Sequence, residues 1–337
     1  MEKRKILFLY RYSSTFVEND YKTLKKHFSV ERMQIKWSLK DFIKLFYRAR
    51  ENDLIFVWFA NWVAFLSIIF SKFWGKKSVV IAGGMDAMWF IKNKKIKNLE
   101  VYGLFEKIQK LISQFVFNHA DFLLPVSKYA ERGVMIISKP KRIKTVYNGV
   151  EPIKVGKIKK KEIVMIVAPL VKINIRKKGL ITFAKASKLV PHAKFFIIGR
   201  YNENSSFYHL LLNVSGKNLE FTGYIERNKL CEIMKEAKVY CQVSYSESFG
   251  YALAEAMLYK CIPVVTNRTA LPEIVGDTGF YVNYGDVIST AKAIKKALKM
   301  PDSFGETPRK RILENFLISK REKDLINVVR LIGDLNE

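Results

Sequence analysis

Cysteine and acidic residues are scarce in this sequence. Its 337 residues include three cysteines, and the 31 aspartates and glutamates are outnumbered by 59 lysines and arginines, for a formal net charge of +28. Cys231, Cys241 and Cys261 all lie in the second half, in helix or strand patterns and without the spacing of metal ligands. We therefore expect reduced core cysteines, as in an intracellular protein, rather than a disulfide framework.

Signals of several other protein classes are also missing. The G-x-G-x-x-G fingerprint follows neither of the strands expected at 6–10 and 163–168, which argues against a dinucleotide-dependent oxidoreductase. No motif of a nucleic-acid-binding domain occurs, so we expect no nucleic-acid partner. The apolar run after residues 3–5 is too short for a secretory signal, so we expect a cytoplasmic protein.

The excess of positive charge favours an anionic partner. The charge is scattered over the whole chain, as on a lysine-rich solvated surface, and that interpretation stays open. In the first half, however, basic residues border aromatic and aliphatic clusters at 37–40, 73–77 and 88–92. Apolar side chains rimmed by lysine suit an anionic lipid surface. Our hypothesis is therefore that the protein associates peripherally with an anionic membrane surface.

One near-continuous apolar run, residues 54–74, is about long enough to span a bilayer. Asn61, Ser67, Ser71 and Lys72 interrupt it, and residues 56–58 favour a β-strand. We predict a strand over 54–58 followed by a helix over 61–73, in a series of alternating strands and helices.

Residues 246–266 form the most informative stretch. They predict a turn over 247–250, a helix over 249–260 and a strand over 262–266, after an earlier strand at 239–243. A helix start offers unpaired N–H groups and partial positive charge, which suits a phosphate. Glu247 lies just outside this start. Glu255 lies about two turns inside it, and because helical side chains lean toward the N-terminus, its carboxylate can reach the same ligand.

Two glutamates eight residues apart, flanking Ser-Phe-Gly, resemble the E-x7-E motif of the family-4 retaining glycosyltransferases, which have the GT-B fold. The resemblance implies that Glu247 contacts the donor sugar and that Glu255 binds the ribose hydroxyls. It also implies that the backbone amides of Ser248, Phe249 and Gly250 hold the diphosphate. The alternative is a pair of solvated glutamates on an ordinary βαβ unit.

The resemblance extends to the loop at 169–178, where the family carries two cations aimed at the donor diphosphate. Lys178, followed by Gly179, matches the second cation and is a catalytic candidate. The first is either Lys172 or Arg176. Solvated lysines on a surface loop are the alternative.

Two further loops of the second half resemble family loops. Gly199-Arg200 follows a predicted strand at 194–198, and Tyr224 follows the segment 219–223 that in the family lies against the nucleotide base. We expect Arg200 and Tyr224 to take part in donor binding, with plain packing as the alternative for the tyrosine.

In the first half, Gly83 and Gly84 follow a predicted strand at 78–82, where a glycine pair lets the backbone approach a ligand. This loop resembles the one that meets the transferred sugar or the acceptor in the family. Because the family's histidine is absent here, Asp86 is the catalytic candidate, and capping of the next segment is its alternative role.

Three further expectations concern the rest of the first half. We predict a strand at 143–146, and we expect Ser127 to cap a helix and His119 to be structural.

Together these patterns predict a GT-B protein with two Rossmann-like doubly wound domains facing across a cleft. We expect an acceptor-side domain at 1–149, a nucleotide-sugar domain at 150–307, and helices at 308–337 that cross back toward the first domain. The implied function is a retaining transferase, of the hexosyltransferase type, acting from a UDP-, GDP- or ADP-linked sugar to a glycan or lipid-linked acceptor. A sugar-nucleotide epimerase of similar fold and a basic membrane- or nucleic-acid-binding protein remain alternatives.

No D-x-D pair occurs, so we expect neither a metal ion nor a cofactor. Protein cations would then stabilise the departing diphosphate. Family resemblance implies that the leaving phosphate takes the acceptor proton and that Glu247 positions the sugar without acting as a nucleophile.

Overall fold

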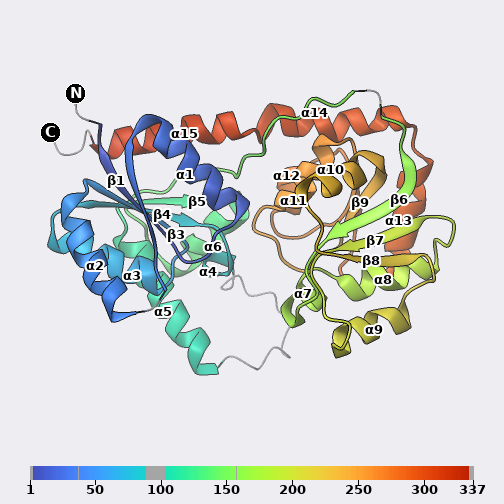
Figure 1. Ribbon diagram of the computed structural model, residues 1–337, viewed down its shortest axis with the longest axis horizontal. Helices are drawn as coiled ribbons and strands as arrows, with labels where there is room; N and C mark the ends of the chain where they lie inside the picture. The colour runs from blue at the N-terminus through green and yellow to red at the C-terminus, as the bar shows by residue number, and fades with distance from the viewer. Residues whose placement is uncertain (1–2, 37, 89–102, 157, 334–337) are drawn as a thin grey trace. The chain divides into compact units, whose positions relative to one another are not determined.

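The computed structural model describes residues 3–36, 38–88, 103–156 and 158–333. The chain folds into two compact units, Met1–Gly149 with Ile318–Glu337 and Val150–Leu317 (Figure 1). Each unit is built on a parallel sheet with helical connections, as predicted. Cys241 and Cys261 are buried, Cys231 is half-buried, and all three are free thiols.

The sheet of the first unit has the order β2-β1-β3-β4-β5. Its central strands are uninterrupted apolar runs because both faces of a parallel sheet are covered by helices. The strands are β1 Lys5–Tyr10, β2 Ser29–Gln34, β3 Leu54–Trp58, β4 Lys77–Ala82 and β5 Phe122–Pro125. The helices before residue 150 are α1 Thr15–His27, α2 Leu39–Glu51, α3 Trp62–Phe73, α4 Met85–Met88, α5 Gly103–His119 and α6 Lys128–Ile137.

The apolar run at 54–74 forms β3 and α3, so the strand-plus-helix prediction is confirmed. Asn61 separates the two elements, and its side chain caps α3 by accepting hydrogen bonds from the backbone N–H groups of Val63 and Ala64. Among the described helices, none has the length and hydropathy needed to cross a bilayer.

One strand prediction in the first unit is wrong. Residues 143–146 form no strand of the sheet; Ile143 makes only an isolated parallel bridge to Leu123. The segment still runs along β5, because the N–H of Lys144 donates to the Leu123 carbonyl at 3.0 Å and that of Val146 to the Pro125 carbonyl at 2.9 Å.

The second unit has a six-stranded parallel sheet in the order β11-β10-β9-β6-β7-β8. The strands are β6 Lys161–Val167, β7 Lys194–Ile198, β8 Leu219–Gly223, β9 Ala237–Gln242, β10 Ile262–Thr266 and β11 Phe280–Val282. The helices are α7 Lys172–Lys177, α8 Leu180–Lys188, α9 Ser206–Val214, α10 Arg227–Glu236, α11 Tyr251–Leu258, α12 Leu271–Val275, α13 Val287–Lys299 and α14 Glu306–Asn315, with a 3-10 turn at Asp302–Gly305. Side chains from β6, β7, β9 and β10 pack with α8 and α13 in one apolar core.

The C-terminal segment forms two helices that belong to different units. Helix α14 packs on α11 and α12 in the second unit, whereas α15 Ile318–Gly333 packs against α1 in the first (Figure 1). A buried ion pair fixes α15, since the Arg321 guanidinium contacts both carboxylate oxygens of Asp20 at 2.6 and 2.7 Å. The same guanidinium donates to the carbonyls of Val146 and Tyr147 at 2.8 and 3.0 Å. These bonds connect α15 to the last residues of the segment Met1–Gly149.

Replacing Arg321 by alanine should lower the free energy of unfolding of the first unit by about 3 to 5 kcal/mol, because Asp20 is then a buried and unpaired carboxylate. Urea unfolding followed by circular dichroism measures the change. The double variant Asp20→Leu with Arg321→Leu removes both charges and should recover part of the loss. An Arg321→Ala protein as stable as the parent would show that α15 is held by its apolar contacts alone.

Candidate active site

The strand order of the second sheet reverses between β6 and β9. From β6 the chain proceeds to β7 and β8 on one side, and β9, β10 and β11 follow on the other. In open parallel sheets, ligands bind outside the carboxyl ends of the strands at such a switch point. Lys178 lies in the segment that follows β6, and Glu247 lies in the loop that follows β9. The topology therefore brings the two predicted catalytic residues to one place.

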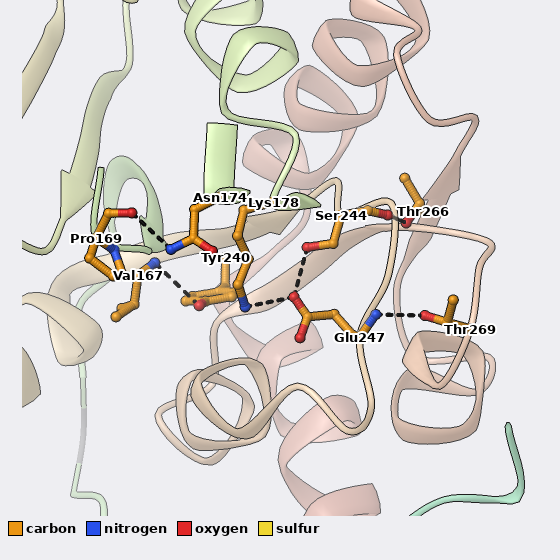
Figure 2. Close-up of polar contacts among 9 residues, drawn as sticks. All are labelled: Val167, Pro169, Asn174, Lys178, Tyr240, Ser244, Glu247, Thr266 and Thr269. Carbon is orange, nitrogen blue, oxygen red and sulfur yellow. Dashed lines mark hydrogen bonds and ion pairs between the residues drawn. The ribbon is translucent and has the colours of Figure 1, made fainter. Parts of the chain in front are cut away.

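Glu247 is buried and fixed at both ends. Its Oε1 lies 2.6 Å from Nζ of Lys178 and accepts a hydrogen bond from the Ser244 hydroxyl at 2.9 Å (Figure 2). Its backbone N–H donates to Oγ1 of Thr269 at 3.0 Å. The carboxylate is thus held in one orientation beside a lysine amine.

The ionisation of Glu247 follows from its neighbours. Burial by itself would raise the pKa of this carboxyl, but the charges of Lys178 and Lys177 and the hydrogen bonds from Lys178 and Ser244 outweigh it and lower the pKa. Glu247 is therefore a carboxylate at neutral pH. Lys177 was not among the predicted site residues; burial lowers the pKa of its amine, against the opposing charge of Glu247.

Gly179 makes the Lys178–Glu247 contact possible. It has φ +68°, and a Cβ atom built on it would lie 2.1 Å from the carbonyl oxygen of Val243. Only glycine allows the segment after β6 to approach the end of β9 so closely. The approach is completed by a backbone hydrogen bond of 2.8 Å from the N–H of Tyr245 to the Lys177 carbonyl.

The segment at 169–178 was predicted as a loop but is partly helical. It contains the short helix α7, and the side-chain amide of Asn174 donates to the Pro169 carbonyl at 2.9 Å (Figure 2). Lys172 and Arg176 both lie exposed on α7, one turn apart. Which of them is the first of the two predicted diphosphate cations, alongside Lys178, stays a prediction.

Helix α11 begins at Tyr251, two residues later than predicted, with Gly250 in the left-handed region at φ +95°. The ring of Phe249 is buried and meets Phe316 edge-on, with centroids 5.8 Å apart. Its side chain is therefore part of the core, which leaves the backbone of Ser248, Phe249 and Gly250 for the predicted diphosphate contact. That contact stays a prediction.

Glu255 is buried on α11 and forms an ion pair with Arg227, the first residue of α10, at 2.5 Å. The hydrogen bond to Glu255 raises the pKa of the Arg227 guanidinium. Arg227 was not predicted, because it lies 28 residues from Glu255 in the sequence and belongs to no local motif. Both glutamates of the E-x7-E motif are thus buried carboxylates, each with its own cation.

Arg200 and Tyr224 lie together after the adjacent strands β7 and β8. The Arg200 guanidinium stands 4.9 Å from the centroid of the exposed Tyr224 ring. Gly199 precedes them with φ +152°, and a Cβ there would lie 2.6 Å from the carbonyl of Ala168. The two side chains are brought together as a pair, and their contact with a nucleotide base stays a prediction.

In the first unit, Asp86 is buried, and both its oxygens accept backbone hydrogen bonds. Oδ2 accepts from Ala60 N–H at 2.9 Å and Oδ1 from Gly84 N–H at 2.7 Å. Burial raises the pKa of this carboxyl, and these bonds offset the rise only in part. Such contacts fix the loops after β3 and β4, with Gly83 packed against Trp58. These contacts give Asp86 a structural role in holding the two loops, and a catalytic role for Asp86 stays a prediction.

Two minor expectations in the first unit hold. The Ser127 hydroxyl accepts a hydrogen bond from Ala130 N–H at 3.1 Å and so caps α6. The His119 ring stacks on Phe115 with centroids 4.2 Å apart and hydrogen bonds to that residue's carbonyl.

In the part of the chain that the structure describes, no three His, Cys, Asp or Glu side chains gather as a metal site requires.

Comparison with known proteins identifies the second domain. The model of the family described as Glycosyl transferases group 1 matches residues 151–315. Residues 151–315 are a group 1 glycosyltransferase domain. Among curated proteins, the O-antigen chain mannosyltransferase B of Escherichia coli is 32% identical over 88 residues, which are 26% of this chain and 23% of that protein.

Several solved structures share the fold of the whole chain. Sucrose-phosphate synthase from Thermosynechococcus elongatus superposes with a TM-score of 0.79 and 15% identity, over 99% of this chain and all of that one. Anabaena HepE in complex with UDP-glucose superposes with a TM-score of 0.77 and 14% identity, over 97% and 99% of the two chains. The lipopolysaccharide outer core galactosyltransferase WaaB gives a TM-score of 0.69 and 15% identity, over 96% and 99%. The predicted GT-B fold is confirmed.

Gly179→Ala should destabilise residues 151–315 and break the Lys178–Glu247 ion pair, because the added methyl group meets the Val243 carbonyl and displaces Lys178. The matched control is Gly285→Ala. Gly285 also has a positive φ, +84°, but nothing lies within 4 Å of a Cβ there, so its substitution should cost only the left-handed backbone term of about 1 to 2 kcal/mol. Urea unfolding measures the loss of stability in each variant. Equal losses for the two variants would contradict the close-approach argument.

Proposed function

We propose that this chain is a glycosyltransferase of the hexosyltransferase type, which moves a sugar from a nucleoside-diphosphate donor to a glycan or lipid-linked acceptor. The observation that carries the proposal is the buried Lys178–Glu247 ion pair at the switch point of a group 1 domain. The mannosyltransferase relative and the UDP-glucose held by HepE support a nucleotide-sugar donor.

In this proposal the donor lies at the carboxyl edge of the second sheet. Glu247, an anion whose orientation is fixed, faces the sugar. Lys178 and the backbone N–H groups at the start of α11 face the diphosphate, and the other cation is Lys172 or Arg176. Each preorganised group of this kind contributes roughly 3 kcal/mol to the stabilisation of developing charge.

Glu255 takes the ribose hydroxyls, because its carboxylate has a second oxygen beside the one that contacts Arg227. Arg227 then acts as a positioning residue, holding the carboxylate in place. Arg200 and Tyr224 take the base, where the exposed ring offers a stacking surface. UDP, GDP and ADP donors all fit this description.

The reaction retains the configuration of the anomeric carbon. The bond from that carbon to the β-phosphate oxygen breaks, the acceptor oxygen bonds to the carbon on the same face, and the leaving phosphate oxygen takes the acceptor proton. Glu247 positions the sugar, since a carboxylate with a lowered pKa holds no proton to donate. Lysine charges stabilise the diphosphate without a metal ion, in keeping with a sequence that has no D-x-D pair. The enzyme works in the cytoplasm, at an anionic membrane surface.

Thermal unfolding in the presence of UDP, GDP, ADP, CMP, NAD, NADP and a short DNA duplex tests the donor site. One nucleoside diphosphate at 100 times its dissociation constant should add about 2.7 kcal/mol of stability. The stabilisation should persist with a chelator and disappear in Glu255→Ala. Stabilisation by DNA or NAD alone would overturn the proposal.

Once the donor is known, Glu247→Gln should lower kcat by about 100- to 1,000-fold while nucleotide affinity is retained, because the substitution removes charge but little volume. Release of nucleoside diphosphate in the presence of acceptor measures kcat. Glu220→Gln, an exposed position on β8, is the matched control and should leave kcat unchanged. Recovery of an epimerised donor without a transfer product would favour an epimerase instead.

A further inference from the structure

Helix α2 carries two apolar stripes, and its packing uses only one of them. Leu45 and Ala49 are buried in the core of the first unit, with Phe42 packed against them. Leu39, Ile43 and Tyr47 recur every four residues on another side of the helix, where they are 74%, 52% and 58% exposed. A surface helix needs one apolar face to join a core. Folding therefore leaves the second stripe unexplained.

The second stripe continues onto α3, which packs beside α2 (Figure 1). Phe46 links the two helices, since its ring centroid lies 5.6 Å from that of Tyr47 and 5.4 Å from that of Phe73. Phe73 is 67% exposed. We refer to Leu39, Ile43, Tyr47 and Phe73 as the outer strip. Large exposed side chains that join in this way mark a surface that contacts something else.

Basic side chains border the outer strip. Lys40, Lys44 and Lys72 are exposed directly beside Leu39, Ile43 and Phe73 in the sequence. Residues 36–51 carry five basic and two acidic side chains, and residues 72–77 carry three lysines and no acid.

Both acids of α2 are already engaged within the unit. Asp41 accepts a hydrogen bond from the N–H of Lys36 at 2.9 Å, and Glu51 pairs with Arg48 at 2.7 Å. Even with these two anions counted, basic side chains outnumber acidic ones around the strip. Of the clusters that the sequence singled out for a membrane, Trp37 and residues 89–92 lie outside the described residues.

We propose that the outer strip and its lysines bind the surface of an anionic lipid bilayer, with α2 and the end of α3 lying in the plane of the headgroups. Aliphatic and aromatic side chains enter the headgroup boundary, where tyrosine is enriched in membrane proteins, and lysines contact lipid phosphates. This specifies the membrane surface named in the proposed function and rests on that part of it alone.

A second copy of the chain is a poor occupant of the same surface. A twofold-symmetric contact places one patch against its own copy, so that Lys40, Lys44 and Lys72 would face the same lysines. Charge complementarity points to an anionic partner, and a bilayer supplies both negative charge and an apolar layer beneath it.

Sedimentation with vesicles of phosphatidylcholine, with and without phosphatidylglycerol, tests the proposal. The parent protein should bind the anionic vesicles, less strongly as salt rises. An apolar variant should lose this binding; it carries Ile43→Ser, Tyr47→Ser and Phe73→Ser. A basic variant should bind about 100-fold more weakly, at roughly fivefold per lysine; it carries Lys40→Gln, Lys44→Gln and Lys72→Gln.

Two control variants separate position from composition. One removes the same charge from exposed lysines of α8 and α13, through Lys185→Gln, Lys292→Gln and Lys295→Gln. The other removes two side chains of α6 that are more than half exposed, through Met135→Ser and Ile136→Ser. Both should bind anionic vesicles within about twofold of the parent, since neither change touches the outer strip.

Three results would overturn the proposal. They are no binding by the parent protein, equal losses in the two lysine variants, and self-association of the parent that the apolar variant abolishes. Nucleoside-diphosphate stabilisation, measured on the same proteins, should be unchanged in all variants. If the parent binds vesicles but no nucleotide, the glycosyltransferase proposal fails and the membrane surface stands.

Discussion

The second domain depends on the ion pair between Lys178 and Glu247. A buried carboxylate is tolerated only when an opposite charge and hydrogen bonds compensate for lost hydration. Glu247 has both, because Gly179 lets the segment after β6 approach the end of β9. The pair therefore links the two loops that leave the switch point, and it fixes a negative and a positive group side by side before any ligand arrives. A Cβ atom at position 179 would meet the Val243 carbonyl oxygen and oppose this approach.

The Arg227–Glu255 pair repeats the same solution on the neighbouring helix. In both cases the carboxylate is buried and the cation is the more exposed partner. This asymmetry matters for binding an anion. The cation keeps access to solvent and hence to a ligand, while the carboxylate is held on the protein side. A diphosphate can thus meet Lys178 without separating it from Glu247, since an ammonium group has three N–H donors.

The sequence predicted features whose cause is local. Strands β7 and β10 and the division of residues 54–74 follow from apolar runs bounded by glycine, asparagine or charged residues. Lys178, Glu247 and Glu255 follow from a motif. The pairing of Arg227 with Glu255 depends on tertiary structure, so no local pattern could indicate it. Residues 143–146 have a strand's composition, but only Ile143 bridges the sheet. The outer strip was partly predicted from clustered aromatics, whereas its exposure depends on which side of α2 joins the core.

What the net charge of +28 can do depends more on where the basic residues lie than on how many there are. Charges on a solvated surface act over about 8 Å at physiological salt, so distant lysines contribute little to any one contact. Lys177 and Lys178 act on a buried carboxylate, where screening is weak. Lys40, Lys44 and Lys72 lie beside exposed apolar side chains, where an anionic surface would come within a Debye length of all of them together. In the proposed functions, two small groups of lysines would account for specific anion binding, and the remainder would provide a general attraction toward negatively charged surfaces.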